Sequence, residues 1–179
     1  AMVRIQGGCD QGWAYCRVPK VRGRERSLPL DAIGSRVAED EAQGFKEIVL
    51  TGTQLGSYGF DLGQHNLAAL LRGILQRTGI PRLRVSSLQP QDIDDELLEL
   101  WSEPRLCPHI HMPLQSGSDR VLTRMRRRYS SSMYEATVER IRRRIGDVAV
   151  TADAIVGFPG ETAMDFEQTL RLCQRVRFA

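Results

Sequence analysis

The strongest constraint on the fold is a regular alternation between short apolar runs and longer stretches with helical periodicity. The pattern predicts strands at 3–6, 46–51, 82–87, 109–112 and 148–157, with a sixth strand beginning at 176–179. It predicts helices at 31–43, from the cap residue Asn66 to the stop residue Gly79, and at 92–102, 118–127, 131–145 and 161–175. Such alternation indicates a parallel sheet with helical crossovers, either open or curved into a barrel. Because an eight-unit barrel needs about 250 residues, the 179-residue chain cannot form a complete one, and we expect it to be a single domain, 1–179.

Composition places the chain among ordinary soluble domains. Its hydrophobic fraction is 41% and its net charge is +3, and no apolar run approaches the roughly 18 residues of a membrane helix. We therefore expect no membrane partner. Four cysteines are too few for a disulfide scaffold in a chain of this length, which favours a reducing cytoplasm. Two of them, Cys107 and Cys173, stand alone and are expected to be inert buried thiols.

Arginines gather in three short segments, "VRGRER" (21–26), "RMRRRY" (124–129) and "RIRRRI" (140–145). Because a guanidinium group contacts phosphate in a bidentate manner, the three clusters together predict an anionic partner. The alternative is that charged helix faces are common in soluble proteins. That alternative applies most strongly to 140–145, which lies on a predicted helix.

Each predicted strand is followed by a loop rich in Gly, Ser, Gln or Pro. The five loops read "GGCDQGWAYC", "TGTQLGSYG", "SSLQPQD", "PLQSGSD" and "GFPGET". Parallel α/β folds build their sites from such loops, so we expect a small-molecule site on this rim, although βα loops are often polar in any case. His109 and His111 share one face of their strand and are expected to line the barrel rather than to bind a metal.

The first of these loops, "CDQGWAYC", places Trp13 between Cys9 and Cys16. Taken alone, it fits either a metal-binding loop that lacks one ligand or two ordinary buried thiols. Together with later segments, however, it resembles the radical S-adenosylmethionine (SAM) methylthiotransferases, whose loop reads C-D-x-x-C-x-Y-C. Asp10 and Tyr15 match that form, as do both cysteines.

The resemblance extends from Val3 to Phe178. Its further segments are "RVPKVRGRERS", "EIVLTG", "VSSLQP", "HMPLQSGSDRVLTRMRRRYS" and "ADAIVGFPGET". It implies the core of a radical SAM enzyme, a partial (β/α)6 TIM-like barrel truncated at the sixth strand. The "LTGTQLGSYG" and "SSLQPQDIDDELLEL" segments look most like the branch that converts N6-threonylcarbamoyladenosine at tRNA position 37 (t6A) to its 2-methylthio derivative. The isopentenyladenosine and ribosomal-protein branches are the siblings.

The resemblance also implies cofactors and partners. In that family three thiolates hold a [4Fe–4S] cluster, and SAM bound at the open iron is split to a 5′-deoxyadenosyl radical. The substrate is tRNA in the cytoplasm, and the electron donor stays unassigned. We expect the family's N-terminal second-cluster domain and C-terminal RNA-binding domain to be absent from this fragment, so that it does not methylthiolate tRNA alone.

Residue roles carry over from the family motifs. The implied cluster ligands are Cys9 and Cys16. The implied SAM contacts are Tyr15 against the adenine, Thr51 and Gly52 at the amino group, Ser87, Gln115 and Arg127 at the ribose and methionine ends, and Gly157 and Gly160 beside the adenine.

Trp13 is the departure from this pattern, because it stands where the family has its middle cysteine. An indole offers only an N–H donor and cannot ligate iron. We therefore predict a labile or absent cluster and no turnover of SAM by the chain as written. One alternative is a cluster-less relative that binds RNA through its arginines. Another is a zinc domain that uses both cysteines and a histidine, which the wide ligand spacing disfavours.

Overall fold

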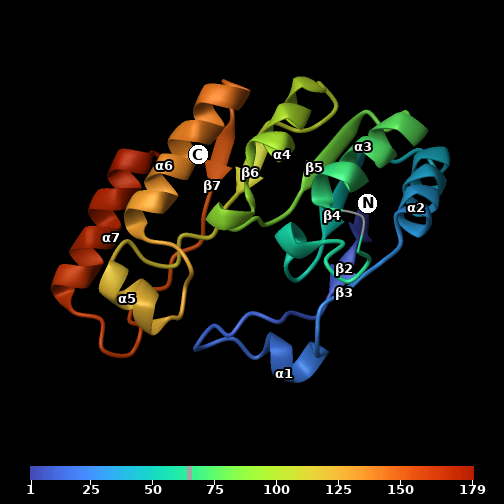
Figure 1. The fold of residues 1–179 in the computed structure, drawn as a ribbon. Helices are drawn as coiled ribbons and strands as arrows, with labels where there is room; N and C mark the ends of the chain where they lie inside the picture. Colours follow the sequence, from blue (N-terminus) through green and yellow to red (C-terminus); the bar gives the residue numbers. More distant parts are fainter. Residues whose placement is uncertain (64–65) are drawn as a thin grey trace.

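Five parallel strands build the centre of the molecule and follow one another in chain order (Figure 1). The computed structural model describes residues 1–63 and 66–179. The parallel strands are β1 (Met2–Arg4), β4 (Glu47–Thr51), β5 (Arg82–Val85), β6 (His109–His111) and β7 (Ala149–Thr151). β1, β4 and β5 form one sheet, β6 and β7 form a second, and an isolated parallel bridge between Ser87 and His111 joins the two. This open succession of parallel strands with helical crossovers is the predicted partial barrel.

The helices flank the strand layer, with α2 and α3 near the first strands and α6 and α7 near the last, whereas α1 lies apart from it at the bottom of the view (Figure 1). Their bounds are α1 (Val18–Arg22), α2 (Leu30–Ala42), α3 (Leu67–Arg77), α4 (Asp95–Glu99), α5 (Asp119–Arg124), α6 (Ser131–Ile145) and α7 (Ala163–Val176). Short 3₁₀ turns occur at η1 (Leu55–Ser57), η2 (Pro90–Asp92) and η3 (Leu100–Ser102). A two-stranded antiparallel ribbon joins β2 (Gln6–Gly7) to β3 (Arg26–Ser27). Among the residues described, no helix combines the length and apolarity needed to cross a membrane.

The core forms where the apolar helix faces meet the strands. Ile48 and Leu50 of β4 are fully buried, as are Leu70 and Ile74 of α3. The four residues follow the periods of a strand and a helix, which put i, i+2 and i, i+4 side chains on one face. Asn66 caps α3 as predicted, because its side chain accepts a hydrogen bond from the backbone N–H of Ala69 at 2.8 Å.

Several predicted boundaries were wrong. The fifth strand was expected at 148–157, but β7 ends at Thr151 because the backbone beyond it meets only one isolated bridge, from Gln115 to Ala154. The first strand was expected at 3–6, but the backbone switches partner after β1, and Gln6 pairs with β3 instead.

The helix predicted at 92–102 begins later and ends as a 3₁₀ turn. Asp94, rather than Asp92, caps α4 by accepting the N–H of Leu97 at 2.7 Å. At the other end of the chain, α7 continues to Val176, beyond the predicted end at 175. The N–H of Ala179 then donates to the carbonyl of Val150 in β7 at 2.9 Å.

Candidate active site at the cysteine loop

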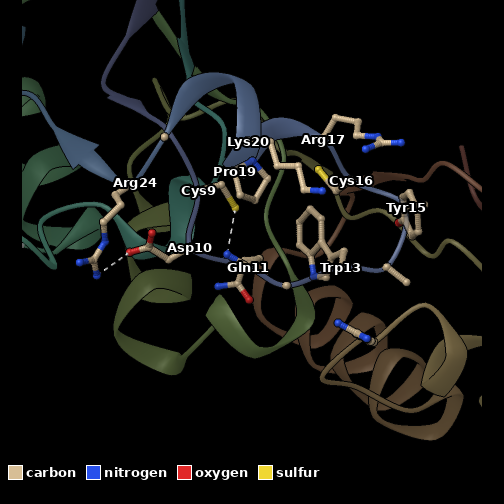
Figure 2. A pocket seen from close by; sticks show the side chains of 14 residues that line it. Cys9, Asp10, Gln11, Trp13, Tyr15, Cys16, Arg17, Pro19, Lys20 and Arg24 are labelled. Atoms are coloured by element: carbon tan, nitrogen blue, oxygen red, sulfur yellow. Dashed lines mark hydrogen bonds and ion pairs between the residues drawn. The ribbon is translucent and has the colours of Figure 1, made fainter.

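The loop between β2 and α1 encloses a cavity of about 680 Å³, which we call the loop cavity. Figure 2 shows Cys9, Trp13 and Cys16 together on its wall. Cys9 is buried and Cys16 is half-buried. Burial raises the pKa of the Cys9 thiol, although its Sγ accepts a hydrogen bond from the N–H of Gln11 at 3.4 Å, which opposes the shift. The parallel strands end on the side where this loop lies, so the first loop occupies the predicted rim.

The loop is fixed by its backbone. The N–H of Cys9 donates to the carbonyl of Gly23 at 3.0 Å, and Ala14 donates to Met125 at 3.1 Å, which ties the loop to the end of α5. Gly8 has a φ of 73°, and a Cβ there would lie 1.9 Å from the Arg24 carbonyl oxygen. Only glycine allows this close approach, and it brings Cys9 beside the segment that follows α1.

Trp13 packs against a cation. The Cζ atom of Arg127 lies 3.9 Å from the centre of the indole ring, within the range of a cation–π interaction. Within 1–63 and 66–179, no group of three or more His, Cys, Asp or Glu residues could hold a metal ion. The described sulfur donors at the loop are thus two cysteine side chains, which do not match a three-thiolate cluster, and no Cys–Cys–His zinc site is present among these residues.

Tyr15, Gln115 and Arg127, predicted at one site, do come together. The Tyr15 hydroxyl donates to Oε1 of Gln115 at 2.7 Å, and a guanidinium N–H of Arg127 donates to the same hydroxyl. A second N–H of Arg127 donates to Oε1 of Gln89 at 3.0 Å. Burial raises the pKa of Tyr15, and the positive charge of Arg127 opposes that shift. The ring of Phe158 meets Tyr15 edge-on, with centroids 6.0 Å apart.

Gln89 and Phe158 were not among the predicted site residues. Both lie in loops that the sequence marked as part of the rim, "SSLQPQD" and "GFPGET". That position was the only available signal for either residue. Gln115 has a φ of 63°, which is uncommon for a residue with a side chain. Such strain gathers at functional sites, and here it aims the amide at Tyr15.

Of the predicted SAM contacts, Tyr15 lines the loop cavity, whereas the others are not among its described lining residues. Thr51 ends β4, and Ser87 bridges to His111. A Cβ on Gly52 would lie 3.2 Å from the side-chain oxygen of Gln6. Their roles toward SAM stay predictions.

The two glycines of "GFPGET" have structural reasons of their own. Gly157 and Gly160 have φ values of 77° and 78°. A Cβ on Gly160 would lie 2.4 Å from the Arg124 guanidinium. The backbone conformation of this loop therefore accounts for glycine at both positions. A close approach of adenine to them stays a prediction.

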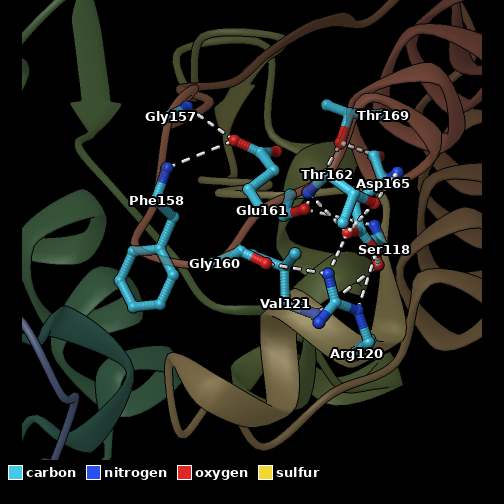
Figure 3. A network of polar contacts seen from close by, with 11 residues as sticks. Ser118, Arg120, Val121, Gly157, Phe158, Gly160, Glu161, Thr162, Asp165 and Thr169 are labelled. Carbon is cyan, nitrogen blue, oxygen red and sulfur yellow. Dashed lines mark hydrogen bonds and ion pairs between the residues drawn. The ribbon is translucent and has the colours of Figure 1, made fainter.

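Polar contacts hold the "GFPGET" loop in place, as Figure 3 shows. Oε2 of Glu161 accepts the N–H of Gly157 at 2.5 Å and that of Phe158 at 3.2 Å. Arg120 donates to the Gly160 carbonyl at 2.8 Å and also to Asp165. These bonds fix the loop to the start of α5 and so set the position of Phe158 against Tyr15.

The remaining predicted thiols and histidines lie elsewhere. Ring nitrogens of His109 and His111 lie 3.1 and 3.0 Å from the Thr151 hydroxyl, as expected for side chains lining the strand layer. Cys107 is buried and Cys173 is half-buried, and burial raises the pKa of both thiols. Cys173 is thus less enclosed than predicted.

Comparisons with known proteins agree with the fold. The model of the radical SAM superfamily matches residues 3–173. In structure, the chain is similar to the radical SAM methyltransferase TsrM from Kitasatospora setae, solved with cobalamin and a [4Fe–4S] cluster. The TM-score is 0.80 at 19% identity, covering 99% of this chain and 34% of that one. Parallel strands, helical crossovers and a cysteine loop at the rim define a radical SAM core.

Sequence relatives narrow the class. The chain is 44% identical to the threonylcarbamoyladenosine tRNA methylthiotransferase of Thermotoga maritima, over 99% of this chain and 41% of the relative. It is 46% identical to the tRNA-2-methylthio-N6-dimethylallyladenosine synthase of Syntrophomonas wolfei, over 99% of this chain and 40% of the relative. The chain belongs to the radical SAM superfamily. Its similarity to these relatives fits the methylthiotransferase family of enzymes within it. The chain spans about 40% of the length of these relatives.

Members of the superfamily use a [4Fe–4S] cluster and SAM. Cys9 and Cys16 are the two thiols predicted to serve such a cluster, and Trp13 stands at the predicted third position without a ligand atom. The residues present therefore do not fit a three-thiolate cluster.

Proposed function

We propose that this chain is the core of a tRNA methylthiotransferase that modifies adenosine 37 in the cytoplasm. The observation that carries the proposal is the agreement over 99% of the chain with two relatives whose names both specify tRNA methylthiolation. Within that class we propose the t6A branch, on the "LTGTQLGSYG" and "SSLQPQDIDDELLEL" segments. Because the chain is similarly identical to both relatives, at 44% and 46%, the branch that modifies dimethylallyladenosine is the competing assignment.

Arg127 and Tyr15 support the placement of SAM near the loop. The Nε–H of Arg127 is buried and has no acceptor among the described residues, while its other nitrogens hold Tyr15 and Gln89. We propose that this free donor pairs with the carboxylate of SAM, and that the Tyr15 ring provides the adenine with a stacking surface. Gln115 holds the Tyr15 hydroxyl and so orients that ring.

We further propose that Trp13 disables cluster binding. Two protein thiolates leave two irons without protein ligands, one more than the family's loop leaves open. The indole also occupies space on the cavity wall, where it stacks on Arg127. The chain as written should therefore hold little iron and should not cleave SAM.

The test is iron and acid-labile sulfide content after anaerobic reconstitution of the chain, Trp13→Cys and Trp13→Ala. Trp13→Ala removes the indole without adding a thiolate and is the matched control. We expect about four irons per chain with Trp13→Cys alone. A full cluster in the unchanged chain would overturn the role given to Trp13, and no iron in any of the three would overturn the cluster site.

The branch needs a separate experiment. The Trp13→Cys form of this core can replace the corresponding core of the Thermotoga maritima relative, and tRNA nucleosides can be analysed by mass spectrometry. Formation of 2-methylthio-t6A is expected. If the chimera modifies only dimethylallyladenosine, the assignment to the t6A branch fails.

A second candidate function is a cluster-less RNA-binding protein. The cation–π contact between Arg127 and Trp13 favours this candidate, because it gives the indole a packing role in the folded loop instead of leaving it only as a lost ligand. Failure of all three reconstituted forms to bind iron, with RNA binding intact, would favour this candidate.

A further inference from the structure

The arginine clusters at 140–145 and 21–26 differ in how far carboxylates of the protein neutralise them. In the 140–145 segment, Arg143 and Arg144 lie 3.8 Å from the carboxylates of Glu139 and Asp95. The other two arginines of that segment donate to backbone carbonyl oxygens. This cluster is therefore a paired helix face, as the alternative interpretation of the sequence expected.

The 21–26 cluster is different. Arg22 and Arg26, together with Arg4 of β1, have no carboxylate within ion-pair distance in the described part of the chain. Arg24 contacts Asp10 at 3.4 Å, but its side chain stays 86% exposed. All four arginines line one cavity of about 490 Å³, whose remaining lining is Gly7, Gly8 and Leu28. No acidic residue lines it. We call this surface the arginine groove.

Local structure explains the convergence. Arg24 lies between α1 and β3, Arg26 begins β3, and both side chains line the groove. Glu25, between them, turns away, and its Oε1 accepts the N–H of Asp10 at 3.2 Å. Gly7 pairs with Arg26 across the ribbon, and nothing lies within 4 Å of where its Cβ would be, so the floor of the groove is open.

The chemistry of the groove fits phosphodiesters. Like charges gathered without counter-charges repel one another, and a polyanion relieves that repulsion while releasing its own counterions. Guanidinium groups bind phosphate oxygens in a bidentate manner. The position is also suitable, because Arg24 lines both the groove and the loop cavity. A strand bound in the groove would run directly past Cys9 and Cys16.

We propose that the arginine groove, formed by Arg4, Arg22, Arg24 and Arg26, binds backbone phosphates of the RNA substrate and holds the strand beside the loop cavity. The inference rests on the proposed function for the identity of the polyanion. It adds which surface of this chain makes the contact.

The test measures binding of a fluorescently labelled anticodon stem-loop RNA to the 179-residue chain between 50 and 200 mM salt. The groove variant is Arg4→Gln/Arg22→Gln/Arg26→Gln. The matched control, Arg143→Gln/Arg144→Gln/Arg171→Gln, removes the same charge from paired arginines on helix faces. Circular dichroism shows whether each variant folds.

We expect the groove variant to bind at least about tenfold more weakly at 100 mM salt and to lose about 2 from the slope of log K against log salt. The control variant should lose much less affinity, and its slope of log K against log salt should change much less. A third variant with lysine at the three groove positions should keep the slope, since charge is conserved, while binding more weakly because the bidentate contact is lost.

Equal losses in the groove and control variants would overturn the proposal, since net charge alone would then explain binding. Unchanged binding in the groove variant would overturn it too. Neither result would count against the proposed function, because that function is tested by iron incorporation into Trp13→Cys, which is measured without RNA. Conversely, failure of Trp13→Cys to bind iron leaves the groove measurement valid.

Discussion

Asp92 connects the loop after β5 to the loop after β4, and replacing it with asparagine tests how its burial affects folding. Its Oδ2 accepts hydrogen bonds from Nε2 of Gln54 at 2.9 Å and from the N–H of Gln89 at 3.1 Å. Gly56 leaves room for it, because a Cβ there would lie 2.0 Å from the Asp92 carboxyl carbon. Burial raises the pKa of Asp92 from 3.8 to about 6, against the opposing effect of the Gln89 hydrogen bond. The negative charge of Glu25 adds to the rise.

The sign of the effect follows from proton linkage. Between about pH 4 and pH 6 the folded chain keeps a proton that the unfolded chain has released, so the free energy of unfolding falls as pH rises through this window. Above about pH 6 Asp92 is ionised in both the folded and the unfolded chain. The free energy of unfolding has then fallen by about 3 kcal/mol at most, because each unit of pKa difference is worth about 1.36 kcal/mol. Asparagine keeps an oxygen acceptor for both hydrogen bonds and cannot ionise. Asp92→Asn should therefore match the unchanged chain near pH 4 and exceed its stability by about 2 to 3 kcal/mol at pH 7.5.

The assay is urea unfolding at pH 4, 5, 6 and 7.5, followed by circular dichroism. Glu99→Gln, at an exposed position of α4, removes the same charge and serves as the control. A stability difference that stays constant across these pH values, or a less stable Asp92→Asn at pH 7.5, would refute the reasoning.

Three further substitutions probe the packing that supports the site. Asp165→Ala removes the carboxylate that accepts hydrogen bonds from Arg120 and Ser118, so Tm should fall at pH 7. These contacts hold the pKa of Asp165 well below its usual range. The difference in Tm between the variant and the unchanged chain should therefore narrow as pH falls below about 4, which thermal melts at several pH values would detect. Leu70→Ala, at a fully buried position of α3, should cost about 2 to 5 kcal/mol in urea unfolding, and a cost under 1 would contradict the described packing. Tyr134→Phe removes a buried hydroxyl that donates to Met112 at 2.6 Å and should cost about 1 kcal/mol by the same assay, whereas no loss would mean that the bond contributes nothing.

Periodicity and capping predicted the long elements well. α6 has the bounds expected from its pattern, because fifteen residues span several turns and Ser130 caps the start. α1 was missed, since five residues of "VPKVR" are too few to show a period. β7 was overextended because apolar residues continue past Thr151 although the ladder does not. A strand's length depends on its partner, which the sequence of one strand does not contain.

The site shows the same division. Family motifs placed Tyr15 and Arg127 in one site, and their hydrogen bond joins residues 112 positions apart. Gln89 and Phe158 complete the arrangement because separate loops meet in the folded chain. The spacing of residues within a single loop cannot predict such a contact. The stacking of Arg127 on Trp13 was likewise not expected, because Trp13 was interpreted as a missing cluster ligand rather than as a packing partner.

The backbone of Gln115 puts folding stability and active-site geometry in competition. With φ at 63°, this residue carries a conformational cost that a glycine would avoid, worth about 1 kcal/mol. Gln115→Gly would also remove the acceptor of the Tyr15 hydroxyl and release the ring that it orients. Relief of the positive φ and loss of this hydrogen bond are each worth about 1 kcal/mol, so Gln115→Gly should change Tm little while freeing the Tyr15 ring to move.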